Sequence, residues 1–414
     1  MKKYVQVGCG HRGIFAYAKP IVKNYADHAA LVGVYDVNCA RAALVSEIVG
    51  CEIPVYDDFD RMLDEAKPDV VIVTSKDSTH DTYAIRAMKH GCDVIVEKPM
   101  TTTPEKCEAI RQTQKETGRR VTVTFNLRYH PLFMKLKEMI MAGAIGDIYS
   151  VHYEWMLNTD HGADYFRRWH RERDNSGSLM VHKSTHHFDI INWLLGEDPI
   201  AVNAFGTRRF YGHTRDERGE RCLTCPYAKT CEYYFDISAG SHKQLYLDCE
   251  KEDGYYRDRC IFADEIDIED TVSVNVKYSG GAVMSYSLVA HSPYEGLRMI
   301  LNGSLGRMEV NYTLRAKDKP ALGAEADMIR IYDRHGCVAC HSIPMWSEAG
   351  HGGADDHMRD HIFGLPIPDP LGSAADIRAG MMSIGIGMAA NISMKEGRAV
   401  ELKEFYGDLL GDGQ

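Results

Sequence analysis

Three side chains with dissociable protons are the first candidates for chemistry in this sequence: Lys98, His182 and His186. Lys98 follows an apolar run that ends at Val96, so we expect it at the carboxyl end of a strand, where open parallel sheets bind their ligands. His182 and His186 are four positions apart, a spacing that places two side chains on one face of a helix. A histidine beside an alcohol can accept the hydroxyl proton, and a lysine can stabilise the developing alkoxide. The pattern therefore predicts chemistry on an alcohol group.

A glycine-rich turn near the start of the chain predicts a dinucleotide site. Gly8-x-Gly10-x-x-Gly13 follows an apolar strand and precedes a helix, and Asp36 comes about 20 positions later. Gly8 permits the tight turn, Gly10 the close approach of a pyrophosphate, and Gly13 the close packing of helix against strand. Asp36 can accept hydrogen bonds from the adenosine ribose. Its charge repels a 2′-phosphate, so the pattern favours NAD over NADP.

Alternating strand and helix patterns up to residue 125 must position these groups. Apolar runs that predict buried parallel strands occur at residues 31–35, 69–74, 93–97 and 120–125. Helical patterns lie between them at residues 40–49, 59–66, 79–90 and 104–117. This alternation predicts right-handed βαβ units, and hence a doubly wound parallel sheet of the Rossmann type over residues 1–125.

After residue 125 the pattern changes to one of period two, which is typical of antiparallel strands with one solvated face. It occurs at residues 148–155, 271–278 and 282–288, and the turn Ser279-Gly280-Gly281 joins the last two as a hairpin. We therefore expect a second α/β domain over residues 126–414, built on an open, mostly antiparallel sheet, with a C-terminal helix at about 373–396. Residues 208–262 are charged and rich in cysteine, and we interpret them as an insertion.

Further motifs occur in a fixed order along the chain. They are Thr79-His80 before a helix, Glu97-Lys98-Pro99, the stretches at residues 126–131 and 143–148, and a helical pattern at residues 383–393. Together with the glycine turn, they resemble the Gfo/Idh/MocA family of glucose–fructose oxidoreductases and inositol dehydrogenases. The resemblance spans nearly the whole chain apart from the insertion. It implies that His186 is the catalytic base and Asp189 a trailing aspartate, whereas His182 occupies a place where aspartate is usual.

The motifs and the resemblance together indicate which residues contact the ligands. We expect the cofactor to be bound by Gly8, Gly10, His11, Arg12, Gly13, Asp36, Ser75, His80, Glu97, Lys98 and Asn126. We expect the substrate to be contacted by Arg128, Tyr129, Trp169, Lys183 and His351. Trp169 lies in a charged run that is also typical of a solvated, salt-bridged segment, and His351 precedes a helix that Asp355 or Asp356 would cap. The orientation of Lys183 stays open, because adjacent helical residues point in different directions.

These observations favour an NAD-dependent oxidoreductase that acts on a secondary alcohol of a sugar, sugar derivative or cyclitol, with His182 orienting the substrate or relaying the proton. One alternative is an NAD-dependent glycosidase that oxidises a sugar carbon transiently, eliminates the leaving group and returns the hydride. His182, His351 and His357 would supply its additional acid and base. Another alternative is a non-catalytic NAD-binding regulator, against which the presence of Lys98 and His186 argues.

The cysteines of the insertion predict a metal site. Cys222, Cys225 and Cys231 form a C-x2-C-x5-C pattern, with Cys260 as fourth ligand and Cys249 as its rival. Four thiolates would suit a structural zinc ion. An iron–sulfur cluster uses the same ligands, and free thiols are the third interpretation. The separate pair at positions 337 and 340 is interpreted as strand cysteines.

Composition narrows the class of protein further. The chain has 414 residues, enough for about two domains, and a formal net charge of −11, which argues against nucleic-acid binding. The apolar stretch at residues 381–392 is too short and too rich in glycine to span a membrane. Residues 1–4 run directly into the first strand, so we expect no signal peptide, a cytoplasmic location and reduced thiols. An open sheet face favours a homodimer or homotetramer.

Overall fold

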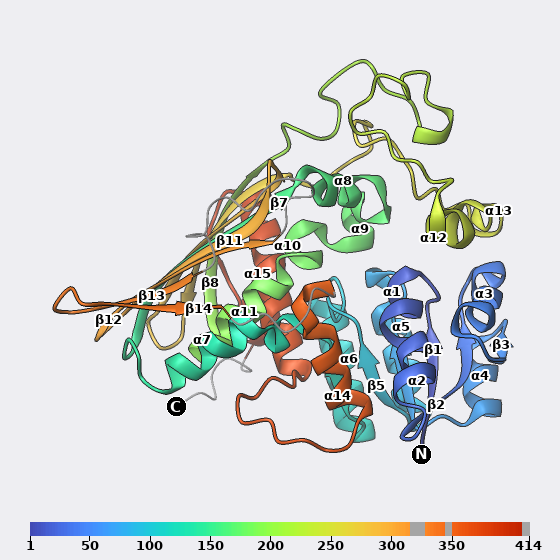
Figure 1. Ribbon diagram of the computed structural model, residues 1–414, viewed down its shortest axis with the longest axis horizontal. Coiled ribbons are helices and arrows are strands. Elements are labelled where there is room, and N and C mark those ends of the chain that lie inside the picture. Colours follow the sequence, from blue (N-terminus) through green and yellow to red (C-terminus); the bar gives the residue numbers. More distant parts are fainter. Residues whose placement is uncertain (315–327, 344–349, 408–414) are drawn as a thin grey trace.

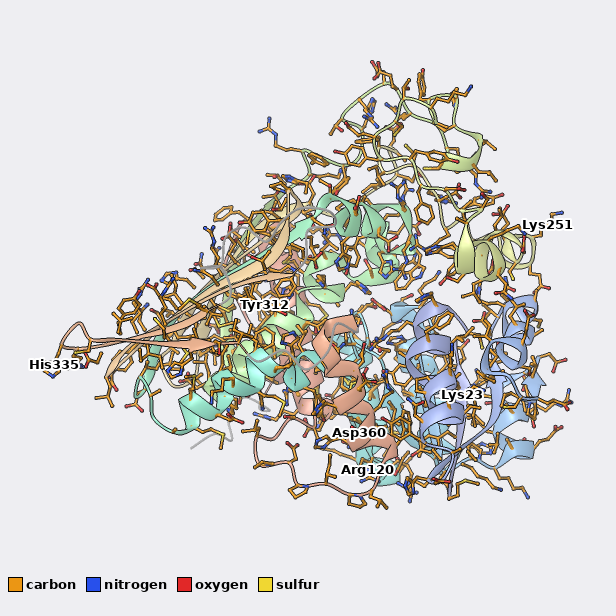
Figure 2. All side chains as sticks on the ribbon, in the orientation of Figure 1. Lys23, Arg120, Lys251, Tyr312, His335 and Asp360 are labelled. Carbon is orange, nitrogen blue, oxygen red and sulfur yellow. The ribbon has the colours of Figure 1, made fainter. Side chains whose placement is uncertain are left out.

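The computed structural model describes residues 1–314, 328–343 and 350–407 of the chain. Figure 1 shows a parallel sheet with its helices beside a broad second sheet, and the segment 208–262 reaches from the second sheet to a position over the first. Lys251 marks this reaching segment, and His335 marks the far tip of the second sheet (Figure 2). Among the described residues, no helix combines the length and the apolar character needed to cross a membrane.

The first sheet lies within residues 2–123 and contains six parallel strands in the order β3-β2-β1-β4-β5-β6. Its strands are β1 (Lys2–Val7), β2 (Ala29–Tyr35), β3 (Val55–Tyr56), β4 (Val70–Val73), β5 (Asp93–Val96) and β6 (Val121–Val123). Strand β1 pairs with β2 on one side and with β4 on the other, so the order of winding reverses at β1. Open α/β sheets bind ligands at such a switch point. The predicted Rossmann arrangement is confirmed.

Helices cover this sheet. They are α1 (His11–Gly13), η1 (Ile14–Ala18), α2 (Lys19–Asn24), α3 (Cys39–Val49), α4 (Phe59–Ala66), η2 (Asp77–Thr79), α5 (His80–Lys89) and α6 (Pro104–Thr117). Helix α3 shows how local sequence sets their limits: the Asn38 side chain accepts the Arg41 N–H at its start, and Gly50 in the left-handed conformation ends it. All of β4 is buried, as expected for a strand covered on both faces.

Within the described residues the second sheet contains nine strands in the order β14-β13-β12-β11-β7-β10-β9-β8-β15. They are β7 (Ile148–Asn158), β8 (Pro199–Thr207), β9 (Thr271–Tyr278), β10 (Val283–Ser292), β11 (Glu295–Gly303), β12 (Gly306–Leu314), β13 (Met328–Asp333), β14 (Val338–Ser342) and β15 (Val400–Glu401). Only the β7–β10 pair among these is parallel. Burial alternates along β9 and β10, so one face packs inward, and the predicted mostly antiparallel sheet is confirmed.

Helices on the inner face of this sheet position the catalytic candidates. They include α10 (Ser178–His182), α11 (Thr185–Leu195) and α15 (Ile377–Glu396), and α15 packs against both of the others and against β8. A Cβ at Gly387 of α15 would lie 2.5 Å from the carbonyl oxygen of Met180, so glycine permits this close packing. The remaining helices are η3 (Asn126–Tyr129), α7 (Pro131–Met141), α8 (Thr159–Arg167), η4 (Trp169–Arg171), α9 (Arg173–Ser176), η7 (Gly350–Gly353), α14 (Ala354–Phe363) and α16 (Lys403–Tyr406).

Segment 208–262 contains short helices: η5 (Cys222–Thr224), α12 (Gly240–His242), η6 (Lys243–Leu247) and α13 (Glu250–Asp253). Ion pairs hold it together, since Arg221 is 2.8 Å from carboxylate oxygens of both Glu250 and Asp258. Its helices α12 and α13 lie beside α1 and α3 of the first sheet (Figure 1), and η6 contacts α3. We refer to residues 208–262 as the insertion.

Candidate active site

A cavity of about 810 Å³ lies between the carboxyl edge of the parallel sheet and the helices that follow β7. Most of the predicted ligand-binding residues line it: Gly8, Gly10, His11, Arg12, Gly13, Asp36, Ser75, His80, Glu97, Lys98, Asn126, Trp169, His182, Lys183 and His186. The glycine turn and the catalytic candidates therefore share one cavity.

The glycine turn leaves room for a ligand close to its backbone. Gly8 has φ +92°, and a Cβ there would lie 2.5 Å from the carbonyl oxygen of Thr74. A Cβ on Gly13 would collide with the carbonyl oxygen of Gly8. At Gly10, by contrast, the nearest atom to a Cβ would be the Tyr246 hydroxyl oxygen, 3.6 Å away, so the space over this residue belongs to the cavity. These residues fit the pyrophosphate of a dinucleotide.

Asp36 lies at the end of the cavity where the adenosine ribose of a dinucleotide is expected. Its carboxylate accepts the N–H groups of Cys9 (2.6 Å) and Asn38 (2.8 Å), and a guanidinium nitrogen of Arg41 is 3.3 Å away. Burial raises the pKa of Asp36, and Arg41 opposes this shift. Arg41 also lines the cavity, as do Tyr246 and Asp253 of the insertion, although no sequence motif marks these three residues.

Arg12 is held by two carboxylates. Its Nε is 2.6 Å from Glu97, and its two terminal nitrogens donate to the two oxygens of Asp355 at 3.0 and 2.9 Å. The Asn126 amide also donates to Asp355 (2.9 Å), and its own buried oxygen has no hydrogen-bond partner among the described residues. Arg12 therefore joins the glycine turn to α14, and the Asn126 oxygen is available to a ligand.

Lys98 lies directly after β5, and its ammonium donates to the backbone carbonyl of His182 (3.1 Å). Burial lowers the pKa of Lys98 to about 8, although Asp77 and Glu97 favour the charged form. The lysine is therefore mostly charged at neutral pH and loses its proton more readily than an exposed lysine.

His182 is paired with a carboxylate that the sequence did not identify. Its Nδ1 lies 2.5 Å from the Asp77 carboxylate, and the two residues are 105 positions apart. Burial, together with nearby His170 and Lys98, lowers the pKa of His182 well below its ordinary value. Burial also raises the pKa of Asp77. The site thus disfavours charge on either partner of this hydrogen-bonded pair.

His182 and His186 do not lie on one helix, as their spacing predicted. Helix α10 ends at His182 and α11 begins at Thr185, because the chain turns after a short helix that starts with Ser178 at φ +76°. Both histidines still line the cavity, and the turn brings Lys183 into its wall as well. The Lys183 ammonium is 5.1 Å from the ring centroid of Trp155, which compensates part of its burial.

A wall of aromatic and basic side chains faces these residues. It comprises His161, Tyr165, Arg168, Trp169 and His170. Trp169 stacks on His170 with ring centroids 3.7 Å apart, and the His170 ring meets that of His182 edge-on at 4.0 Å. Arg168 pairs with Asp164 at 3.1 Å. The charged run around Trp169 therefore belongs to the cavity wall and is not a solvated segment.

Comparison with known proteins identifies the family. Residues 2–125 match the oxidoreductase family with an NAD-binding Rossmann fold, Gfo/Idh/MocA, and residues 137–402 match its C-terminal alpha/beta domain. The chain belongs to the Gfo/Idh/MocA family. It is an NAD-dependent oxidoreductase, consistent with a cavity whose glycine turn fits a dinucleotide.

Individual relatives agree with this assignment. YteT of Bacillus subtilis (strain 168), named as an oxidoreductase on a provisional basis, is 37% identical over 427 residues, which cover 98% of this chain and 99% of that protein. The scyllo-inositol 2-dehydrogenase (NAD(+)) of the same organism is 31% identical over 203 residues, 48% of this chain and 56% of that enzyme. An oxidoreductase from Agrobacterium radiobacter, solved with NAD+, L-tartaric acid and magnesium, shares the fold with a TM-score of 0.66 at 15% identity, covering 97% of this chain and 99% of the other.

Two residues expected to contact substrate in this Gfo/Idh/MocA protein face away from the cavity. Arg128 donates two hydrogen bonds of 2.7 Å to Asp189, because a buried guanidinium requires a carboxylate. Tyr129 is buried, and its ring packs against His361. Neither lines the cavity within the described residues. The side chain of His351 lies outside the described part of the structure.

His80 has a positioning role in the cavity wall. Its two ring nitrogens lie 2.8 Å from the carbonyl oxygen of Pro99 and 3.1 Å from that of Ser75. The ring therefore connects the turn after β4 to the turn that carries Lys98. The Ser75 and Thr79 hydroxyl groups form a hydrogen bond with each other (2.8 Å). Both turns are thereby fixed around the cavity.

The predicted metal site is not supported. The four cysteines Cys222, Cys225, Cys231 and Cys260 do line one small cavity, but arginines enter it as well. Arg167 donates to the sulfur of Cys222 (3.3 Å) and Arg215 to that of Cys231 (3.1 Å). Burial raises the pKa of Cys222, which favours a protonated thiol over a thiolate ligand. Among the described residues no group of three or more His, Cys, Asp or Glu side chains could hold a metal ion, and all twelve cysteines are free thiols.

The rival ligand Cys249 lies elsewhere in the insertion. Its thiol donates to the carbonyl oxygen of Gln244 at 3.3 Å. The pair at the second sheet behaves as interpreted: Cys340 lies in β14, Cys337 lies just before it, and both are exposed.

Proposed function

We propose that this protein oxidises a secondary alcohol of a sugar, sugar derivative or cyclitol. The observation that carries the proposal is the single cavity that joins the glycine turn and Asp36 to Lys98, His182 and His186. NAD bound there would accept a hydride from the alcohol carbon. The inositol dehydrogenase among the relatives acts on a cyclitol, which supports this class of substrate.

His186 is proposed to accept the hydroxyl proton, and Lys98 to stabilise the negative charge that develops on the oxygen. Lys98 suits this role because its ammonium is fixed by the carbonyl of His182 at the wall of the cavity. His182 is proposed to orient the substrate or to relay the proton, with Asp77 fixing its ring. The exposed part of Trp169 in the same wall offers an apolar surface for the carbon face of a ring-shaped substrate.

A redox-neutral glycosidase is the second candidate, and the Asp77–His182 pair is the observation that favours it. A transiently oxidised sugar has an acidified neighbouring C–H bond, and its elimination needs an acid and a base in addition to the oxidising pair. Asp77 and His182 form a hydrogen-bonded pair that lines the same cavity as Lys98 and could supply both. Net oxidation requires no such second pair.

One experiment separates these candidates. The purified protein is incubated with NAD+ and a panel of free sugars, sugar acids, cyclitols and aryl glycosides, while NADH absorbance and aglycone release are followed together. NADH formation from a free alcohol supports the oxidoreductase, and aglycone release without net NADH supports the glycosidase. Lys98→Met should abolish either reaction, whereas Lys89→Met, at an exposed lysine of α5 that does not line the described cavity, should not. Unchanged turnover in Lys98→Met would contradict both candidates.

We also propose that the outer face of the second sheet joins subunits into a homodimer or homotetramer. A groove of about 480 Å³ runs across strands β7 to β10 on that face, and Phe205 and Val283 nearby are 71% and 50% exposed. Light scattering after gel filtration tests this expectation. A cytoplasmic location and the division into residues 1–125 and 126–414 likewise stay predictions.

A further inference from the structure

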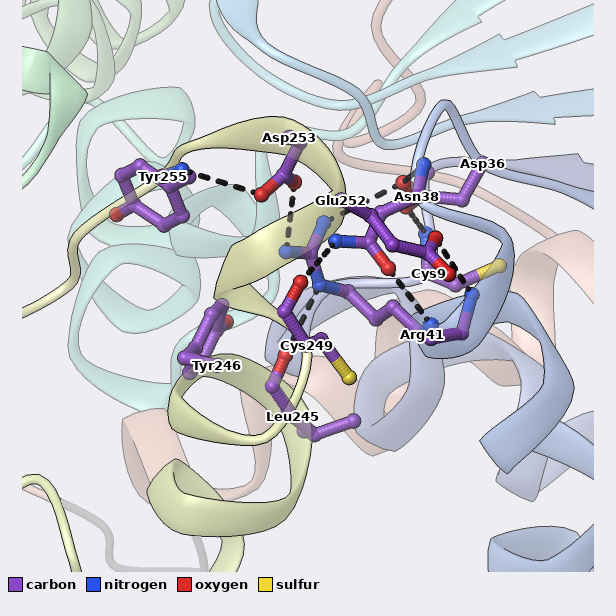
Figure 3. Close-up of polar contacts among 12 residues, drawn as sticks. Cys9, Asp36, Asn38, Arg41, Leu245, Tyr246, Cys249, Glu252, Asp253 and Tyr255 are labelled. Carbon is purple, nitrogen blue, oxygen red and sulfur yellow. Dashed lines mark hydrogen bonds and ion pairs between the residues drawn. The ribbon is translucent and has the colours of Figure 1, made fainter.

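The insertion touches the turn that carries Asp36. Figure 3 shows the contact, in which residues 245–255 lie against the start of helix α3. The Asn38 amide donates to the carbonyl of Cys249 (2.9 Å), the Arg41 Nε to the carbonyl of Leu245 (3.0 Å), and the Ala40 N–H to the Glu252 carboxylate (3.0 Å). Backbone and side-chain bonds thus fix the insertion at the adenosine end of the cavity.

Arg41 lies between two carboxylates at this contact. One terminal nitrogen is 3.3 Å from Asp36, and the other is 2.9 Å from Asp253 of the insertion. Arg41 is 6% exposed, and all three residues line the cavity. Asp253 is itself held in place, since its second oxygen accepts the N–H of Tyr255 (3.1 Å).

An arginine at this position has two opposite effects on cofactor choice. Beside the adenosine ribose, a free guanidinium is the usual partner of a 2′-phosphate and would favour NADP. With both carboxylates bound to it, the residues that line this end of the cavity carry two negative charges and one positive charge, since the exposed Glu252 is not part of the lining, and a phosphate would meet net repulsion. If Asp36 were the only carboxylate bound to Arg41, the two charges would cancel, and one terminal nitrogen of the guanidinium would be unpaired. The second carboxylate therefore decides the sign of the local charge.

We propose that Asp253 is a specificity-determining residue that makes the enzyme reject NADP by engaging Arg41. The inference rests on the dinucleotide site of the proposed function and extends its specificity to a residue far from the Rossmann motif. Asp253 lies 212 positions from Arg41, in a segment that a Rossmann domain does not require. The insertion thus completes the cofactor site in addition to covering it.

The test measures binding without any alcohol substrate. Titration calorimetry gives the dissociation constants of NAD+ and NADP+ for the wild type and for Asp253→Asn, which keeps the side-chain shape and the acceptor for Tyr255. We expect the preference for NAD+ to fall about tenfold, chiefly through tighter NADP+ binding, which corresponds to about 1.4 kcal/mol. Glu252→Gln is the matched control, because the neighbouring carboxylate binds the Ala40 N–H and not Arg41. Its preference should stay that of the wild type.

A double variant tests whether the gain in NADP+ affinity depends on Arg41. Arg41→Ala combined with Asp253→Asn should lose the gain in NADP+ affinity, because the guanidinium that would meet the phosphate is absent. An unchanged preference in folded Asp253→Asn, an equal change in Glu252→Gln, or a gain that persists in the double variant would each overturn the inference. If the wild type bound neither dinucleotide, the proposed function would fail together with it, whereas NAD+ binding with an unaltered Asp253→Asn preference would overturn this inference alone.

Discussion

Turnover should decline as the pH rises through about 8, because Lys98 then loses the charge that stabilises the alkoxide. Burial lowers the pKa of Lys98 from 10.5 to about 8. At about 1.4 kcal/mol per pKa unit, this change corresponds to roughly 3 kcal/mol against the charged form. Lys98 is therefore charged at neutral pH, but a rise of about one pH unit is enough to remove its proton from half of the molecules.

The size of the decline follows from the protonated fraction. With a pKa of about 8, roughly one tenth of Lys98 would be charged at pH 9 and about one hundredth at pH 10. A lysine with the ordinary pKa of 10.5 would be about three quarters charged at pH 10. Between pH 7 and pH 10, kcat/KM for the alcohol should therefore fall about a hundredfold, with unit slope on a logarithmic plot.

Initial rates of NADH formation from pH 6 to pH 10.5 provide the assay. Lys98→Arg is the informative variant, because a guanidinium stays charged throughout this range. It should be slower at pH 7 but should lose the alkaline decline. A wild-type profile that stays flat to pH 9.5, or an unchanged decline in Lys98→Arg, would refute the assignment of the charged group.

Other perturbations separate structural from chemical roles. Lys98→Met should abolish turnover but raise the thermal unfolding midpoint in scanning calorimetry. The increase in the free energy of unfolding, up to about 3 kcal/mol, should be fully present below pH 8 and should vanish by pH 10.5. Between these pH values the unfolded wild type binds the lysine proton more tightly than the folded one does, so the wild type regains stability as the pH rises. Asp77→Asn should lower kcat about 10- to 100-fold with unchanged NAD+ binding by calorimetry, since it removes the partner of His182. Arg128→Met should lower the free energy of unfolding in urea by roughly 3–5 kcal/mol, because it leaves the buried Asp189 unpaired, and should leave KM for the alcohol unaltered. A raised KM would indicate that Arg128 contacts the substrate after all. Gly13→Ala should abolish NAD+ binding, as its Cβ collides with Gly8.

The cofactor half of the site could be predicted from the sequence because its determinants are local. The glycine turn, Asp36 and Lys98 each follow a strand whose apolar pattern is readable, and the carboxyl ends of parallel strands meet at one edge. The position of Asp77 carried a similar signal, since it comes four residues after the end of β4. That signal does not identify a pair, because the partner of Asp77, His182, is 105 positions away in the chain.

The substrate half depended on tertiary structure. A four-residue spacing indicates one helical face only if the helix is continuous, and here the chain turns between His182 and Thr185. The sequence likewise does not determine where the Arg128 side chain points. It pairs with Asp189 because the fold buries both residues together. The metal prediction is not supported for a related reason: the spacing indicates that four cysteines approach one another, but it does not indicate that Arg167 and Arg215 enter the same cavity.

The proposal that a histidine is the base is supported by the state of the carboxylate next to Lys98 in the chain. Glu97 adjoins Lys98 and lines the cavity, so it is the obvious rival. Its oxygens already accept the Arg12 guanidinium (2.6 Å), the Tyr17 hydroxyl (2.7 Å) and the backbone N–H of Lys98 (3.0 Å). Burial alone would raise the pKa of Glu97, but Arg12 and Lys98 hold it below the ordinary value, which makes the carboxylate a weak base. Glu97 is therefore suited to orient Lys98 and to balance the charge of Arg12, which agrees with the proposal that a histidine accepts the proton of the alcohol.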